Sequence, residues 1–161
     1  MVNFIMLNPS TANETQDDQT TLRCISFARD WGYGQLKITN LFAFRTPQPS
    51  ELFAATTDPV GTENDGYILR TAGAAHLVVA AWGNDGHHLY RSTSVLEMLK
   101  EYKIHPAALQ LTSQKAPAHP SRLKKFLVPI DLDTGRPIAN IPSIHQANYH
   151  KQMDLFLDKW I

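Results

Sequence analysis

The chain has 161 residues, of which 43% are hydrophobic and 19% are charged, and this is the length and composition of one globular domain. Lys plus Arg and Asp plus Glu number 15 each, so no overall basic field attracts nucleic acid, and any such role must rest on a local patch. A single cysteine excludes an internal disulfide and a four-cysteine iron–sulfur cluster. We expect a cytoplasmic protein with no membrane span, no secretory leader, no metal and no cofactor.

The first predicted strand is the apolar run at residues 4–7, and Pro9 ends it because proline cannot donate to a sheet ladder. A helical stripe of apolar residues runs from Leu22 to Trp31 and stops at Gly32. The next stretch alternates as a second strand and then breaks at prolines. We expect this strand over 36–41, a short helix over 50–55 and a longer helix over 61–75.

The clearest strand of the second half is residues 76–82, whose unbroken apolar run predicts burial on both faces. The remaining elements are a helix over 89–102, a short strand over 108–111, a polar loop over 112–120, strand-like pieces within 126–141 around a hairpin turn at 133–136, and an amphipathic helix over 145–161.

Strands and helices alternate along the chain, which predicts an α/β fold with three α/β/α layers and a four-stranded parallel sheet. We expect a single domain over 1–161, with a core at 1–126 and a C-terminal extension at 127–161 that is an appendage to it. The apolar face of the final helix is a candidate contact for a homodimer.

Polar residues follow predicted strands at their carboxyl ends, where ligands bind in open α/β sheets. Asn8 follows the first strand, Asn40 closes the second, and His119 follows the fourth. We therefore expect these side chains to meet in one hollow at this edge of the sheet.

Four separated stretches resemble motifs of the uracil-DNA glycosylase superfamily. They are Asn8-Pro9-Ser10, Ile38-Thr39-Asn40 with Arg45 and Pro47 downstream, residues 78–83 ending in Trp82-Gly83, and residues 118–123 containing His119-Pro120-Ser121. Their order and spacing cover residues 1 to about 126. The resemblance implies the sheet order 2-1-3-4 for the four parallel strands.

A second resemblance is to an uncharacterised bacterial and phage family that carries the label domain of unknown function 1643. It rests on residues 8–12, Asp17-Asp18, residues 31–34, 40–43, 58–61 and 80–83.

The glycosylase resemblance implies roles for particular side chains. Asn8 would hold the attacking water, Asp17 or Asp18 would supply a carboxylate, and His119 would donate to the oxygen of the departing base. Asn40 offers a donor and an acceptor to a pyrimidine edge. Further contacts with the base or substrate are expected from Pro9, Ser10, Phe42, Phe44, Arg45, Trp82, Gly83, Asn84, Ser121, Arg122 and Leu123.

Each of these residues also has a purely structural interpretation. Asn8 can close a strand through an Asx turn, Asp18 can cap the following helix, and Asn40 can satisfy loop backbone groups. His119 can be a surface histidine, and residues 122–125 can be a solvated basic run.

The leading functional hypothesis is recognition of a uracil-like or modified pyrimidine, or hydrolysis of its N-glycosidic bond, in DNA or a nucleotide. The partner is then a nucleobase, a nucleotide or nucleic acid, and the neutral charge favours single-stranded over duplex substrates. The alternatives are a non-catalytic nucleobase- or nucleic-acid-binding module and a phage or bacterial protein-interaction factor.

Overall fold

The computed structural model describes residues 1–10 and 19–141. An interior strand of its sheet is β1 (Val2–Met6), in which all five residues are buried. β1 lies between β2 (Leu36–Asn40) and β3 (Leu77–Ala80) and runs parallel to both, with Phe4 beside Ile38 and Val79. The apolar run that predicts a buried strand therefore forms an interior strand of the sheet.

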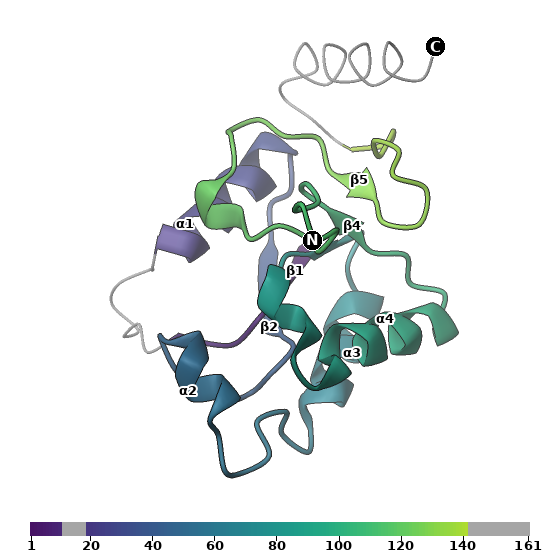
Figure 1. The fold of residues 1–161 in the computed structure, drawn as a ribbon. Helices are drawn as coiled ribbons and strands as arrows, with labels where there is room; N and C mark the ends of the chain where they lie inside the picture. Colours follow the sequence, from purple (N-terminus) through teal and green to yellow (C-terminus); the bar gives the residue numbers. More distant parts are fainter. Residues whose placement is uncertain (11–18, 142–161) are drawn as a thin grey trace.

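Two short strands extend the sheet beyond β3. β4 (Ala107–Ala108) is parallel to β3, and β5 (Ile130–Asp131) is antiparallel to β4. The order is β2-β1-β3-β4-β5, and β4 and β5 lie side by side in Figure 1. The α/β class is thus confirmed, but the sheet has five mostly parallel strands in place of the predicted four. The reason is that a hairpin brings the segment after residue 126 back to pair with β4, whose edge would otherwise be open.

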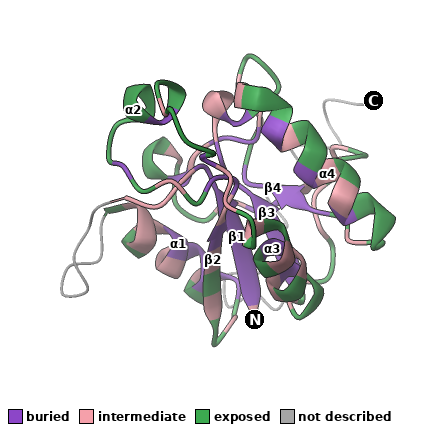
Figure 2. Cartoon of the chain, turned by 90° about the horizontal axis from the view of Figure 1, so that it is seen from below, coloured by how far each residue is buried: buried purple, intermediate pink, exposed green. Residues whose placement is uncertain are grey.

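Helices cover both faces of the sheet. The helical segments of the described residues are α1 (Gln19–Asp30), α2 (Pro49–Phe53), α3 (Asn64–Gly73), η1 (Asn84–Tyr90), α4 (Arg91–Glu101) and η2 (Pro120–Arg122). One core joins α1 to one face through Trp31, on whose ring both Phe27 and Phe4 stack. The other core joins α3 and α4 to the opposite face through Ile68 and Val95. Figure 2 shows β1, β3 and β4 as buried strands and β2 as a partly exposed strand, covered by helices whose outer sides are exposed.

The described part of the C-terminal extension that is predicted from residue 127 onwards packs into the first hydrophobic core, the one that contains α1. The Trp31 indole Nε1 donates to the Leu127 carbonyl at 2.7 Å, and Val128 is buried. Residues 127–141 therefore contribute both a strand and core contacts. The predicted helix over 145–161 lies outside the described residues.

Helix α4 begins later than predicted. Leu89 and Tyr90, which we expected to be helical, have φ angles of 51° and 55°, in the left-handed region that non-glycine residues rarely adopt. Both side chains are exposed, so packing does not hold them in a helix.

A buried arginine holds the end of β2. The Arg91 side chain, 5% exposed, donates from Nε to the Leu41 carbonyl at 2.7 Å and pairs with Asp65. The Asn64 amide donates to the Asn40 and Leu41 carbonyls at 3.0 Å each. Helices α3 and α4 thereby fix the carboxyl edge of the sheet. Within residues 1–10 and 19–141, no helix is long and apolar enough to cross a bilayer.

Candidate functional site

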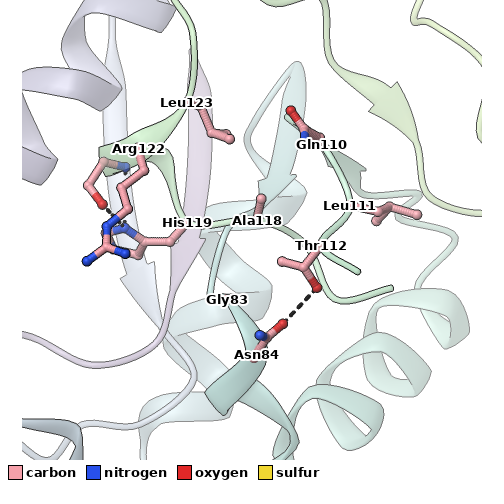
Figure 3. A pocket seen from close by; sticks show the side chains of 10 residues that line it. Gly83, Asn84, Gln110, Leu111, Thr112, Ala118, His119, Arg122 and Leu123 are labelled. Atoms are coloured by element: carbon pink, nitrogen blue, oxygen red, sulfur yellow. Dashed lines mark hydrogen bonds between the residues drawn. The ribbon is translucent and has the colours of Figure 1, made fainter. Parts of the chain in front are cut away.

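A hollow of about 450 Å³ lies at the carboxyl ends of β3 and β4 (Figure 3). Its lining comes from the turn after β3, from the stretch after β4, and from η2 with its flanking residues. The lining residues are Gly83, Asn84, Gln110, Leu111, Thr112, Ala118, His119, Ser121, Arg122 and Leu123. This is the edge of an open parallel sheet at which ligands bind.

Gly83 makes the turn from β3 into the hollow. Its φ angle is 75°, a conformation that glycine adopts without steric cost. Its N–H donates to the Pro117 carbonyl at 2.8 Å, and a Cβ on this residue would lie 3.7 Å from the Cβ of His119. The backbone of β3 and the loop before η2 are therefore joined directly at the floor of the hollow.

The stretch after β4 forms a tight reversal beside this turn. The Ala118 N–H donates to the Gln110 carbonyl at 2.8 Å, and the Thr112 N–H donates to the Ala116 carbonyl at 2.8 Å. A bridge between Leu111 and Pro117 lies between them. This reversal positions Thr112 opposite Asn84, and the two side chains are 2.7 Å apart between Oγ1 and Oδ1.

The orientation of the His119 imidazole is set by η2. His119 caps this turn, and its Nδ1 accepts the Ser121 N–H at 3.3 Å and lies 2.9 Å from the Ser121 Oγ. Because a backbone N–H always donates, Nδ1 carries a lone pair, and the proton of the neutral ring is on Nε2. His119 thus presents a hydrogen-bond donor.

The electrostatic character of the hollow is set by Arg122. In the described part of the chain, this guanidinium is the charged group of the lining, and no carboxylate accompanies it. Lys124 and Lys125 follow as exposed residues. In Figure 3, Arg122 and His119 lie on one side of the hollow, and Thr112 and Leu111 lie on the other. The hollow therefore suits a ligand with anionic or carbonyl oxygens.

Leu123 is held from outside the hollow. Its carbonyl accepts from the Arg23 guanidinium, which also lies over the Phe27 ring at 4.9 Å from the centroid. Helix α1 therefore anchors the end of η2.

Asn8 does not line this hollow. Its Nδ2 donates to the carbonyls of Thr46 at 2.8 Å, Pro9 at 3.1 Å and Phe44 at 3.3 Å. Arg45 Nη1 donates to the Ser10 carbonyl at 3.2 Å in the same region. These contacts hold the loop after β2 against the loop after β1.

The other predicted residues have different surroundings. Asn40 is the last residue of β2, where it pairs with Met6. Phe42 is fully buried, with its ring 5.7 Å from the ring of His88, and Phe44 packs beside the same core. Trp82 is 3% exposed and belongs to that core too. None of these residues lines the hollow. Asp17 and Asp18 lie outside the described residues.

Six of the predicted site residues are thus brought together, namely Gly83, Asn84, His119, Ser121, Arg122 and Leu123. Sequence reasoning missed Gln110, Leu111, Thr112 and Ala118. A usable signal existed, because Gln110 and Leu111 end the fourth predicted strand and Thr112 directly follows it, at the carboxyl end where ligands bind. Asn8 and Asn40 do not join His119 in the hollow.

Metal ligation is not apparent in the part of the chain that the structure describes, where no three His, Cys, Asp or Glu side chains gather. No curated protein and no solved structure matches the chain. The family described as "Protein of unknown function (DUF1643)" matches residues 1–121, which is most of the sequence. The chain therefore belongs to the DUF1643 family.

Proposed function

We propose that this protein is a uracil-DNA-glycosylase-like enzyme that recognises a uracil-like or modified pyrimidine and hydrolyses its N-glycosidic bond, in a nucleotide or in DNA. The observation that carries the proposal is the hollow at the carboxyl ends of β3 and β4, where His119 is held as a donor next to Arg122. The parallel strands β2-β1-β3-β4 support it, because this is the order that the resemblance implies.

The chemistry follows from charge development. When water attacks C1′ of the sugar, a C1′–O bond forms and the electron pair of the N-glycosidic bond moves to the base, whose carbonyl oxygens become more negative until the base takes up the proton that the water loses. A neutral His119 imidazole that donates from Nε2 would stabilise such an oxygen. Arg122 would stabilise the same charge, or a neighbouring phosphate, by a charge-assisted hydrogen bond.

A non-catalytic nucleobase-binding module is the second candidate, and a specific observation favours it. In the described part of the chain no carboxylate lines the hollow, and the Asn8 amide donates to three backbone carbonyls. Among the described residues, neither a carboxylate nor the Asn8 amide is then in place to activate water, whereas the donors for binding a base are. The interaction-factor hypothesis depends on the helix predicted over 145–161, a segment that lies outside the described residues.

The test is a base-release assay on the full chain. Its substrates are single-stranded oligonucleotides and mononucleotides that contain uracil or modified pyrimidines. We expect release by the wild-type protein and a loss of about 100- to 1,000-fold in the rate for His119→Ala, the usual effect of removing one oxyanion donor. His105→Ala is the matched control, since His105 is an exposed histidine near Asp133 and outside the hollow.

Three outcomes separate the candidates. Release that depends on His119 but not on His105 supports the enzyme. Binding of the same ligands without release, weakened by His119→Ala, supports the binding module and refutes the hydrolase. If the chain neither binds these ligands nor releases a base, both candidate functions are refuted.

A further inference from the structure

The Thr112 hydroxyl has a fixed donor direction. Its oxygen accepts the Gln114 N–H and the Ala116 N–H, each at 3.2 Å. A hydroxyl oxygen has two lone pairs, and both are engaged by these backbone donors. Its single hydrogen is therefore directed to the remaining neighbour, the Asn84 Oδ1 at 2.7 Å.

This hydrogen bond fixes the orientation of the Asn84 amide. Because Oδ1 accepts from Thr112, the amide nitrogen takes the opposite position, and in Figure 3 it lies on the side of the group away from Thr112. Rotation of the amide by half a turn would set the Nδ2 donors against the Thr112 hydroxyl, whose own hydrogen would then lose its acceptor. The turn at residues 112–116 thus determines that the oxygen of the Asn84 amide faces Thr112 and that its nitrogen faces away.

We propose that Thr112 is a positioning residue that makes Asn84 a donor, and that this pair selects ligands with an oxygen acceptor over ligands with an amino group at this side of the hollow. The inference rests on the proposed function and adds to it a rule for which base is preferred. Asn84 and His119 come from different elements, yet both are held as donors by backbone-anchored contacts.

Uracil and cytosine test this rule well. Both rings carry an oxygen at C2, which His119 would take, and they differ at C4, where uracil has an oxygen and cytosine an amino group. An amino group set against the Asn84 Nδ2 leaves two donors without acceptors. We expect about 10- to 100-fold weaker binding of the cytosine ligand, the usual effect of leaving a buried donor unsatisfied.

The experiment measures binding to the full chain of uridine and cytidine monophosphates, and of single-stranded pentanucleotides that differ only in a central uracil or cytosine. The readout is the ratio of the two dissociation constants, which a general loss of affinity leaves unchanged. Asn84→Asp keeps the size of the side chain and replaces its donor by an acceptor. We expect this variant to reverse the preference towards cytosine.

Substitutions of Thr112 test the positioning role. Thr112→Val removes the hydroxyl at constant shape, and we expect the ratio to fall towards one. Thr112→Ser retains the hydroxyl and should keep the wild-type ratio. Circular dichroism and thermal unfolding show which variants fold. If Thr112→Val does not fold, Asn84→Asp still tests the selection rule, because Asn84→Asp leaves the turn at 112–116 intact.

The outcomes separate this inference from the proposed function. Binding of both ligands with equal affinity by the wild-type chain, or an unchanged preference for uracil in Asn84→Asp, overturns the selection rule and leaves base recognition standing. Loss of the preference in both Thr112→Val and Thr112→Ser overturns the positioning role. If the wild-type chain binds neither base, the proposed function and the rule both fall.

Discussion

The side-chain amides of Asn8 and Asn84 have different roles at the carboxyl edge of the sheet. Asn8 donates to three backbone carbonyls and joins the loops after β1 and β2. Asn84 receives a hydrogen bond on its oxygen and turns its nitrogen the other way. The difference arises from the neighbours, because the part-buried loop carbonyls beside Asn8 need donors and the Thr112 hydroxyl needs an acceptor. The first amide is therefore a structural clamp and the second a candidate ligand contact.

Gly86 gives a prediction at the scale of one residue. A Cβ on Gly86 would lie 2.1 Å from Cδ1 of the buried Trp82 indole. Substitution by alanine must then displace the ring or the backbone of η1. We expect Gly86→Ala to lower the free energy of unfolding by about 1–3 kcal/mol, the usual cost of overpacking a core, as measured by urea denaturation.

Gly73→Ala is the control for that change. A Cβ on Gly73 meets nothing within 4 Å, and the residue ends α3. Alanine has the higher helix propensity, so we expect unchanged stability or a gain of up to about 1 kcal/mol. Equal losses in both variants would show that the contact with Trp82 is not the cause.

The candidate site could be predicted in part from such residues. Gly83, Asn84 and His119 follow strands, and the rule that ligands bind at strand ends finds them. No local sequence rule predicts that Asn8 holds the two loops together, because its acceptors Phe44 and Thr46 lie 36 and 38 residues away along the chain. Which carbonyls lack a partner is known only once the loops have packed.

Helix ends show the same limit at the scale of elements. The end of α1 was predictable, because Gly32, with φ at 80°, is the residue type that favours a left-handed helix end. The start of α4 was not, because Leu89 and Tyr90 are left-handed without being glycine. Local propensity favours a helix there, and the path of the chain from η1 overrides it.

The hairpin turn after β5 gives a prediction of pH dependence. Burial raises the pKa of Asp131, but hydrogen bonds from the Thr134 N–H and Oγ1 and from the Asp133 N–H, with the charge of His105, bring this pKa below its ordinary value. A carboxyl whose pKa is lowered in the folded state stabilises the fold above its ordinary pKa of about 4. That contribution disappears as the pH falls through the folded pKa.

Asp131→Asn should therefore be less stable than the wild-type chain at pH 7, by no more than about 1 kcal/mol because water screens this carboxylate. The difference should vanish on titration below about pH 4. Thermal unfolding across this range measures it. Asp133→Asn is the matched control, with its exposed carboxylate 3.4 Å from the His105 ring. A deficit for Asp131→Asn that persists in acid would contradict the assignment.

Most of the architecture of the whole molecule followed from hydrophobic pattern. Unbroken apolar runs indicated β1 and β3, and the alternation of strands with helices indicated a parallel sheet. β5 was not predictable as a sheet member, because it has only two residues and both are half-buried. Its place depends on pairing with β4, a contact between distant parts of the chain.

Arg91 gives a prediction for the molecule as a whole, since it connects α4 with the end of β2 and with Asp65 of α3. Arg91→Met keeps the apolar stem and removes the donors. We expect the free energy of unfolding to fall by about 1–3 kcal/mol, the cost of leaving buried polar groups unpaired, as measured by denaturant unfolding.

Arg70→Met is the comparison for that variant. Arg70 is exposed, and its guanidinium lies 5.4 Å from the centroid of the Tyr67 ring. Loss of this exposed cation–π contact should cost no more than about 1 kcal/mol. A smaller effect for Arg91→Met than for Arg70→Met would contradict a stabilising role for the Arg91 contacts with Leu41 and Asp65.

The interior position of β1, between β2 and β3, has a consequence for biosynthesis. Val2 pairs with Leu36 on one side and with Leu77 on the other. At a translation rate of about 5–20 residues per second, the ribosome adds β3 roughly 4–15 s after β1. During that interval one edge of the apolar strand β1 is unpaired, because β3 has not yet been synthesised. The β1 strands of nascent chains on adjacent ribosomes can pair with one another through this edge. Chaperone engagement in those seconds should therefore govern the yield of folded protein.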